Sequence, residues 1–171
     1  MSLALKIFQV TGFKNSGKTT LMCRLLFELK KRSYKVAALK HHGHGGRLRT
    51  DMDDTDSAKH FRSGASLAAV SGSMQTIFDY QNEPPLEAFI AFYQTLQLDF
   101  LLIEGYKQAP YPKAVLLRSN EDWETLQALK NIRVIVASEG MAIPNPTAPV
   151  FANDNVEGLT TFILNGLEEV W

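Results

Sequence analysis

One stretch near the start of the sequence constrains the fold more than any other, the run Gly12-x-x-x-x-Gly17-Lys18-Thr19. It follows a predicted strand at residues 5–11 and precedes a leucine-rich segment. A strand, a glycine-bearing loop and a helix in this order form a phosphate-binding loop. The backbone N–H groups of such a loop point inward, and the positive end of the following helix favours bound phosphate. The stretch therefore predicts a nucleoside triphosphate site.

The side chains of this loop have distinct predicted roles. Gly12 and Gly17 permit the unusual backbone angles of the loop and the close approach of a ligand. The ammonium of Lys18 is placed to reach the β- and γ-phosphates, which also makes it a candidate catalytic residue, and the hydroxyl of Thr19 is placed to bind Mg²⁺. The complete predicted nucleotide-binding set is Gly12, Lys14, Asn15, Ser16, Gly17, Lys18, Thr19 and Thr20.

The hydrophobic pattern that follows the loop predicts a parallel sheet. Leu21, Leu25 and Leu29 recur at helical spacing, so residues 17–32 are expected to form an amphipathic helix. Residues 34–40 are expected to form the next strand. A strand, a helix and a strand of these lengths form a right-handed unit with parallel strands.

The second predicted strand leads into a glycine-rich loop that contains His41, His42 and His44, three of the four histidines in the chain. Ligands bind at the carboxyl ends of the strands in an open parallel sheet, so this loop is expected to border the phosphate-binding crevice. Two interpretations stay open: the histidines contact a ligand or a metal, or they belong to a mobile polar loop without such a role.

Residues 47–56 are dense in charge and hydroxyl groups and include four aspartates. Carboxylates close to a phosphate-binding loop can hold Mg²⁺ directly or through water, because this ion prefers oxygen ligands. Alternatively, the segment is an exposed loop whose last Asp or Thr caps a helix at residues 57–63, and Asp56 is the expected cap.

A second informative stretch lies at residues 99–107. Residues 100–103 are uninterruptedly apolar, as expected of a central parallel strand that is buried on both faces, and Glu104 and Gly105 follow. A carboxylate at this end of the strand lies beside the phosphate-binding loop, where it can hold a Mg²⁺-bound water or orient the attacking water. Glu104 is therefore a candidate metal-binding and catalytic residue, and the alternative is a strand that ends in a solvated glutamate.

The remaining segments complete one expected domain over residues 1–171, a P-loop NTPase-type three-layer α/β/α fold with a mainly parallel central sheet. Two short strands, at 67–71 and 74–78, are expected to contribute a strand to the main sheet and a neighbouring edge strand. Further helices are expected at 85–97, 122–130 and 155–167, and further strands at 114–117, 132–137 and 150–151.

Composition excludes several other classes of protein. The 18 acidic residues balance the 18 basic ones, so we expect neither nucleic-acid binding nor membrane binding. The single cysteine, Cys23, excludes an internal disulfide and is expected to be a packed helical residue. The sequence contains no long apolar run and no signal-peptide pattern, so a soluble cytoplasmic protein is expected.

With these residues assembled, the sequence resembles the MobB family, the molybdopterin-guanine dinucleotide biosynthesis adaptor proteins. The resemblance rests on the phosphate-binding loop at residues 10–21, the strand and histidines at 36–42, and the Leu-Ile-Glu-Gly-Tyr-Lys run at 102–107. The acidic stretch at 53–56 and the turn at 61–65 extend it. It covers essentially the whole chain and is more specific than the phosphate-binding loop alone.

The resemblance implies a GTP-binding protein with weak GTPase activity that assists molybdopterin guanylyltransferase and other molybdenum cofactor enzymes and forms a homodimer. Its core is similar to those of nickel-insertion and signal-recognition GTPases. The resemblance assigns Thr19 and Glu104 to Mg²⁺, with Asp53 as a further ligand. The sequence contains no Asn-Lys-x-Asp guanine-reading motif; residues 137–139 are the nearest positional candidate, and GTP is not separated from ATP.

Alternative functions remain open at this point. A small-molecule kinase would share the loop and the sheet and would need an arginine-bearing lid, for which Arg47 and Arg49 are the clustered candidates. A metal-insertion GTPase would use His41, His42 and His44. A nucleotide-binding module without catalysis is a third possibility. Because no residue stands out as a general base or a built-in arginine finger, we favour a slow GTPase whose output depends on another protein.

Overall fold

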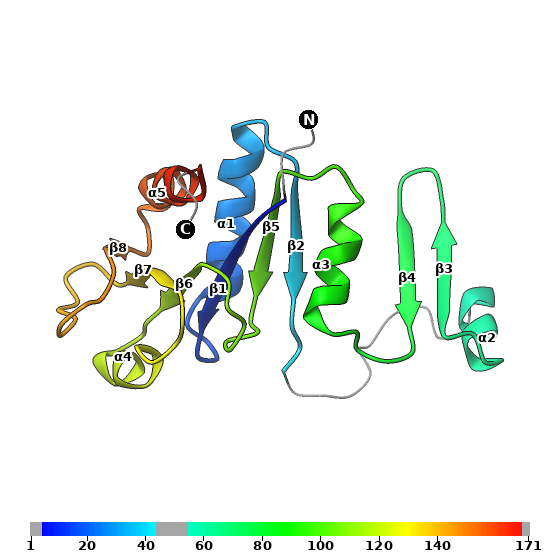
Figure 1. Cartoon of the computed structure of the whole chain (residues 1–171), viewed down its shortest axis with the longest axis horizontal. Helices are drawn as coiled ribbons and strands as arrows, with labels where there is room; N and C mark the ends of the chain where they lie inside the picture. The colour runs from blue at the N-terminus through cyan, green and yellow to red at the C-terminus, as the bar shows by residue number, and fades with distance from the viewer. Residues whose placement is uncertain (1–4, 44–54, 169–171) are drawn as a thin grey trace. The chain divides into compact units, whose positions relative to one another are not determined.

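The computed structural model of the chain describes residues 5–43 and 55–168 (Figure 1). The chain divides into two compact units, one formed by Met1–Gly43 with Phe92–Trp171 and the other by His44–Ala91. The first unit contains the predicted phosphate-binding loop. The expected organisation of residues 1–171 as a single domain stays a prediction.

The first unit is built on a six-stranded sheet with the strand order β2-β5-β1-β6-β7-β8. Every neighbouring pair of these strands is parallel. The carboxyl ends of all six strands therefore lie along one edge, where ligands bind in sheets of this kind. The strands are β1 (Lys6–Gly12), β2 (Val36–Lys40), β5 (Phe100–Glu104), β6 (Lys113–Leu116), β7 (Ile132–Ala137) and β8 (Val150–Ala152).

Helices cover both faces of this sheet. Successive residues of a strand point to opposite faces, so neighbouring residues of β7 show which helices lie on each face. Val134 and Val136 of β7 pack into the cluster that contains α1 (Lys18–Lys31) and α5 (Val156–Glu168). Ile135 of the same strand packs into a second cluster with α4 (Asn120–Leu126). The predicted three-layer α/β/α fold of the P-loop NTPase type, with a mainly parallel sheet, is confirmed.

The core explains why the two informative stretches meet. Every residue of β5 is buried, as its apolar sequence predicts, and β5 lies between β2 and β1. The pairing registers place Val10 of β1 and Lys40 of β2 opposite Glu104. Leu21, Leu25 and Leu29 form the buried stripe of α1, as expected from their spacing. This stripe packs against apolar residues of β1 and β5, which brings the start of the helix beside Glu104.

The second unit contains α2 (Asp56–Arg62), β3 (Leu67–Ser71) and β4 (Thr76–Tyr80). The two strands form their own antiparallel sheet, so the expectation that one of them joins the main sheet is wrong. The cause is local: the turn between them is closed by a hydrogen bond from the Gly72 N–H to the Gln75 carbonyl, 2.8 Å long. The boundary between the two units along the chain falls within α3 (Leu86–Gln94).

The start of α2 also differs from the expectation. Thr55, rather than Asp56, is the N-cap, because its side-chain oxygen accepts a hydrogen bond from the Ala58 N–H at 3.3 Å. Asp56 instead forms an ion pair with Lys59, 2.8 Å away. In the described part of the chain, no helix is both long enough and apolar enough to cross a membrane.

Candidate nucleotide-binding site

The backbone of the predicted phosphate-binding loop adopts left-handed angles where the sequence offers residues that tolerate them. Gly17 has a φ of 87° and Asn15 a φ of 62°. At Gly12, a Cβ atom would lie 2.7 Å from both the Leu116 carbonyl oxygen and the Ser16 hydroxyl, so only glycine fits there. Helix α1 begins directly after Gly17 without a side-chain cap. Its first N–H groups are therefore available to an anionic ligand.

Lys18 lies over the loop that precedes it. Its ammonium donates a hydrogen bond to the Phe13 carbonyl, 2.6 Å away. Burial lowers the pKa of Lys18, the carboxylate of Glu104 opposes this effect, and nearby cations, with Lys107 first among them, lower the pKa further. A bound phosphate would supply the negative charge that this surrounding favours.

Thr19, Glu104 and Lys40 form a three-membered cluster at the ends of β2 and β5. The Thr19 hydroxyl lies 3.0 and 3.1 Å from the two carboxylate oxygens of Glu104. The Lys40 ammonium donates a hydrogen bond to the Thr19 hydroxyl at 3.0 Å and lies 3.2 Å from Glu104 Oε1. Glu104 is only 6% exposed. The structure thus brings together two of the three residues predicted to bind Mg²⁺, and Asp53 lies outside the described residues.

The donor set of this cluster fits Mg²⁺. A hydroxyl and a carboxylate are the oxygen ligands that this ion prefers, and it usually keeps several water molecules besides. The Lys40 ammonium shows that a cation is accommodated against both oxygens. Thr19 and Glu104 would therefore hold the ion, and a bound Mg²⁺ would supply charge compensation for the phosphates.

Two buried polar side chains that the sequence reasoning missed hold the segment after Glu104. The first is Gln9 of β1, which is completely buried. Its amide nitrogen donates hydrogen bonds to the Gly105 and Tyr106 carbonyls, both at 2.5 Å. Gly105 and Tyr106 both have positive φ, 97° and 46°, so the chain turns sharply here. A glutamine between Phe8 and Val10 in a buried strand was the available signal.

The second is Lys113 at the start of β6, which is also completely buried. Its ammonium donates hydrogen bonds to the carbonyls of Lys107 and Ala109, at 3.2 and 2.5 Å. Burial lowers the pKa of Lys113 to about 8. The available signal in the sequence was a lysine directly before the apolar residues of β6, because a charge buried there needs hydrogen-bond partners.

We expect Lys113 to make the stability of the protein rise with pH. The pKa of Lys113 is about 8 in the folded chain and 10.5 as its ordinary value, so the unfolded chain binds more protons between these limits. The free energy of unfolding should therefore rise from about pH 8 to about pH 10. Urea unfolding of the wild type and of Lys113→Met across this range measures the effect, which the variant should lack.

An exposed lysine serves as the control for this measurement. Lys130→Met removes a lysine at an exposed position and should keep the wild-type pH dependence. A Lys113→Met profile parallel to the wild-type profile would contradict the assignment of the rise to this ammonium.

Two further cations of the predicted phosphate-binding site lie over the ring of Phe13. The Lys107 ammonium lies 4.2 Å from the centre of the Phe13 ring, and the Arg118 guanidinium carbon lies 5.5 Å from it. Arg118 also donates a hydrogen bond to the Lys14 carbonyl at 3.2 Å. Asp122 fixes Arg118 through bonds of 2.7 and 2.8 Å, and the hydrogen bond from Arg118 lowers the pKa of Asp122. The surroundings of the loop therefore favour an anionic ligand.

The histidine loop is only partly described. The ring of His41 stacks on the Tyr106 ring at 4.4 Å, and the His41 N–H bonds to the Glu104 carbonyl. The described start of this loop, at His41, therefore lies beside Glu104. His44 and the arginines of the kinase alternative, Arg47 and Arg49, lie outside the described residues. Within residues 5–43 and 55–168, no group of three metal-binding side chains is assembled.

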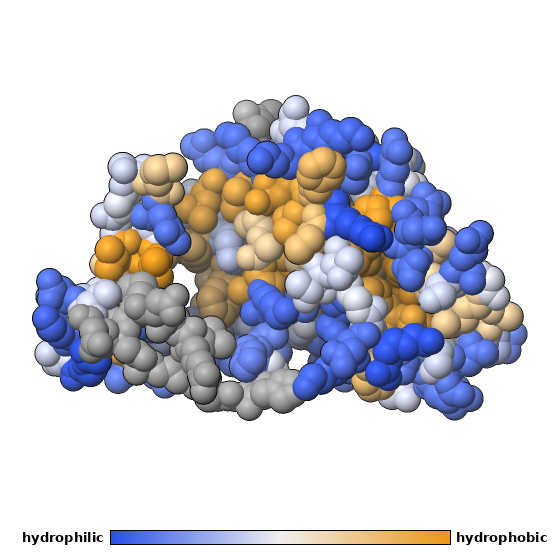
Figure 2. Space-filling model, turned by 180° about the vertical axis from the view of Figure 1, so that it is seen from behind, coloured by the Kyte–Doolittle hydropathy of each residue, from blue (hydrophilic) through white to orange (hydrophobic). Residues whose placement is uncertain are grey.

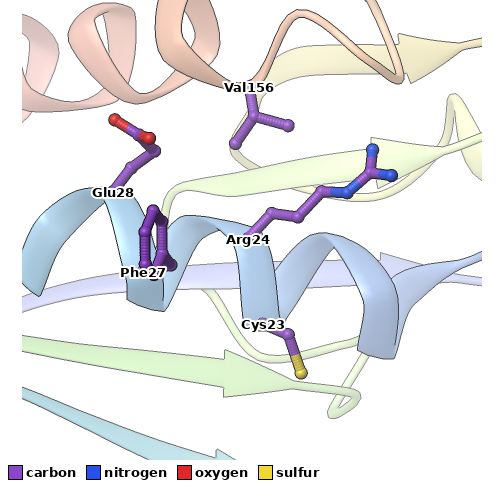
Figure 3. A pocket seen from close by; sticks show the side chains of 5 residues that line it. All are labelled: Cys23, Arg24, Phe27, Glu28 and Val156. Atoms are coloured by element: carbon purple, nitrogen blue, oxygen red, sulfur yellow. The ribbon is translucent and has the colours of Figure 1, made fainter.

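A shallow depression lies elsewhere on α1. It has a volume of about 260 Å³ and is lined by Cys23, Arg24, Phe27, Glu28 and Val156 (Figure 3). None of these belongs to the predicted nucleotide-binding set. Cys23 is exposed, so the expectation that it is a packed helical residue is wrong.

Comparison with known proteins agrees with the geometry. The family described as "Molybdopterin guanine dinucleotide synthesis protein B" matches residues 7–138. The chain is 38% identical over 162 residues to the probable molybdopterin-guanine dinucleotide biosynthesis adapter protein of Bacillus subtilis, which covers 95% of this chain and 93% of that protein. The crystal structure of Bacillus subtilis MobB has a TM-score of 0.79 at 35% identity, covering 94% of this chain and 97% of that chain.

A more distant solved structure shares the fold. HypB from Helicobacter pylori, in complex with nickel, has a TM-score of 0.55 at 18% identity and covers 97% of this chain and 88% of that chain. At this level of identity the likeness concerns the fold alone.

Proposed function

Because this chain belongs to the molybdopterin guanine dinucleotide synthesis protein B family, we propose that it is a GTP-binding adapter in molybdopterin-guanine dinucleotide biosynthesis. The observation that carries the nucleotide-binding part is the meeting of the phosphate-binding loop with Glu104. The Thr19 hydroxyl lies 3.0 Å from that carboxylate, directly beside Lys18. Family membership favours this function over the kinase and the metal-insertion GTPase.

In this proposal, different groups of the loop bind the phosphates and the Mg²⁺ ion. The backbone N–H groups from Gly12 to Thr20 hold the phosphates, together with the side chains of the predicted nucleotide-binding set. Lys18 leaves the Phe13 carbonyl for the phosphate oxygens, and Thr19 and Glu104 hold Mg²⁺. Asp53 is proposed as a further Mg²⁺ ligand.

Hydrolysis is proposed to be slow. With Mg²⁺ bound, the carboxylate of Glu104 would be engaged by Thr19 and the metal ion, so it would be a poor acceptor for a proton from an attacking water. Lys18 and Glu104 would then act on the phosphates by charge and position rather than by proton transfer. A slow intrinsic reaction suits an adapter whose nucleotide state is read by a second protein.

The proposed partners are molybdopterin guanylyltransferase, other molybdenum cofactor enzymes and a second copy of this chain, in the cytoplasm. A two-stranded sheet is marginal on its own, and the β3–β4 hairpin exposes several large apolar side chains, which favours a contact with another chain. Figure 2 shows apolar side chains at the surface among hydrophilic ones. Sedimentation of the purified chain, alone and with the guanylyltransferase, tests both contacts. The exposed large apolar residues of the hairpin are Leu67, Val70, Met74, Ile77, Phe78 and Tyr80.

Calorimetry with GTP, ATP and GMP, each with and without Mg²⁺, tests the proposed function directly. We expect GTP with Mg²⁺ to bind in the micromolar range, and ATP to bind at least about tenfold more weakly, a difference of about 1.4 kcal/mol. GMP should bind more weakly still, because it lacks the β- and γ-phosphates that Lys18 contacts. Equal or tighter binding of ATP, or no binding of GTP, would contradict the proposal.

A further inference from the structure

We propose that the Lys40 ammonium is a built-in competitor of Mg²⁺, which occupies the oxygens of Thr19 and Glu104 until the metal ion displaces it. The inference deepens the proposed function, since it concerns the metal site of the same nucleotide-binding loop. It makes Lys40 a residue that sets how strongly nucleotide binding depends on the metal.

The geometry of the cluster carries the first step. The Lys40 ammonium lies 3.0 Å from the Thr19 hydroxyl and 3.2 Å from Glu104 Oε1, so it contacts both proposed metal ligands. These two ligands also contact each other, at 3.0 and 3.1 Å. An ammonium that touches a hydroxyl and a carboxylate at once takes the place that a cation would take between them.

The sheet places Lys40 there. Lys40 is the last residue of β2, and the parallel register pairs it with Glu104, the last residue of β5. Neighbouring side chains at paired positions of a sheet point to the same face. The His41 N–H bond to the Glu104 carbonyl, 2.9 Å long, extends this pairing one residue further. The contact therefore follows from the strand order rather than from a chance orientation of a long side chain.

Electrostatic repulsion prevents Mg²⁺ and the Lys40 ammonium from contacting the oxygens of Thr19 and Glu104 at the same time. Mg²⁺ binds oxygen at about 2.1 Å, so an ion held by both Thr19 and Glu104 would lie no more than about 4 Å from an ammonium that kept its present contacts. Repulsion at such a distance is several times stronger near a protein surface than in bulk water. The Lys40 side chain is 57% exposed, whereas that of Glu104 is 8% exposed, so the lysine is the group that can move into water.

The competition has two consequences that can be measured. The ammonium neutralises Glu104 when no metal is bound, so it reduces the repulsion between that carboxylate and incoming phosphates. The affinity of the wild-type protein for nucleotide should therefore depend less on Mg²⁺ than that of a variant without Lys40. Without Lys40 the metal meets no competitor, and the unneutralised Glu104 makes metal-free nucleotide binding weaker.

Two titrations of Lys40→Met test the inference. In the first, electron paramagnetic resonance follows the binding of Mn²⁺, used as a probe for Mg²⁺, to nucleotide-free protein. We expect Lys40→Met to bind Mn²⁺ about tenfold more tightly than the wild type, as removal of a neighbouring unit charge implies. In the second, a fluorescent GTP analogue is titrated with Mg²⁺ and with a chelator. The ratio of the two dissociation constants should grow about tenfold in the variant.

Matched variants separate the charge from the fold. Lys40→Arg keeps a cation at the position and should stay close to the wild type in both titrations. Lys30→Met removes one positive charge from an exposed position near the end of α1 and should leave both unchanged. If Lys40→Met loses its circular dichroism spectrum or its thermal transition, Lys40→Gln takes its place, because its polar amide is tolerated at an exposed strand end.

The outcomes distinguish this inference from the proposed function. Equal Mn²⁺ affinity in the wild type and in Lys40→Met overturns the competition, even if GTP binds as expected. Failure of the wild type to bind the GTP analogue overturns the proposed function. If the wild type does not bind the GTP analogue but Lys40→Met binds Mn²⁺ more tightly than the wild type, the competition between Lys40 and the metal ion is supported and the proposed function is not.

Discussion

Replacement of Lys18 by alanine is expected to abolish the thermal stabilisation that GTP with Mg²⁺ gives the wild-type protein. A ligand at a hundred times its dissociation constant stabilises a protein by about 2.7 kcal/mol, which for a chain of this length is a shift of roughly 5–10 °C. The ammonium of Lys18 is proposed to contact the phosphates, and alanine cannot replace its charge. Differential scanning fluorimetry with and without the ligand measures the shift.

The variant should fold normally without ligand. Lys18 contributes a hydrogen bond to the Phe13 carbonyl, and burial disfavours its charge, so its removal costs the folded state little. Lys30→Ala, at an exposed position near the other end of the same helix, is the control and should keep the full shift. An undiminished shift in Lys18→Ala would show that the nucleotide does not bind at this loop.

Many residues of the site could be predicted because they lie within short, recognisable runs of the sequence. The glycines and Lys18 lie within one short run, and the apolar run before Glu104 identifies a central strand whatever its neighbours are. What the sequence could not show is which strands are neighbours. The order β2-β5-β1 is what brings Lys40 beside Glu104, and no pattern in β2 or β5 specifies it.

The buried polar residues were missed for a related reason. Gln9 bonds to a carbonyl 96 residues away in the sequence, so its partner is set by the fold and not by its neighbours in the chain. The carbonyls that accept hydrogen bonds from Lys113 are likewise brought to it by the fold, which also buries it completely. The prediction that β3 or β4 joins the main sheet was wrong because the geometry of the connecting turn decides how such short strands pair. A hydrogen bond within the turn at Gly72 pairs these two strands with each other.

Glu104→Gln is expected to remove most of the effect of Mg²⁺ on GTP affinity. Glutamine has nearly the same shape, and its side-chain oxygen can still accept the hydrogen bond from the Thr19 hydroxyl. It cannot supply the negative charge that holds a hard divalent cation. Calorimetry with Mg²⁺ and with a chelator should give dissociation constants that differ by less than about threefold in the variant.

This result has the opposite sign to that expected for Lys40→Met, although both residues belong to one ion pair. If the pair were only structural, both substitutions would lower stability and leave the metal dependence of GTP binding alone. If Glu104 holds the metal and Lys40 competes with it, the first variant loses the dependence and the second increases it. Glu157→Gln, in the exposed first turn of α5, is the matched control and should behave as the wild type. A Glu104→Gln protein with undiminished Mg²⁺ dependence would remove this carboxylate from the metal site.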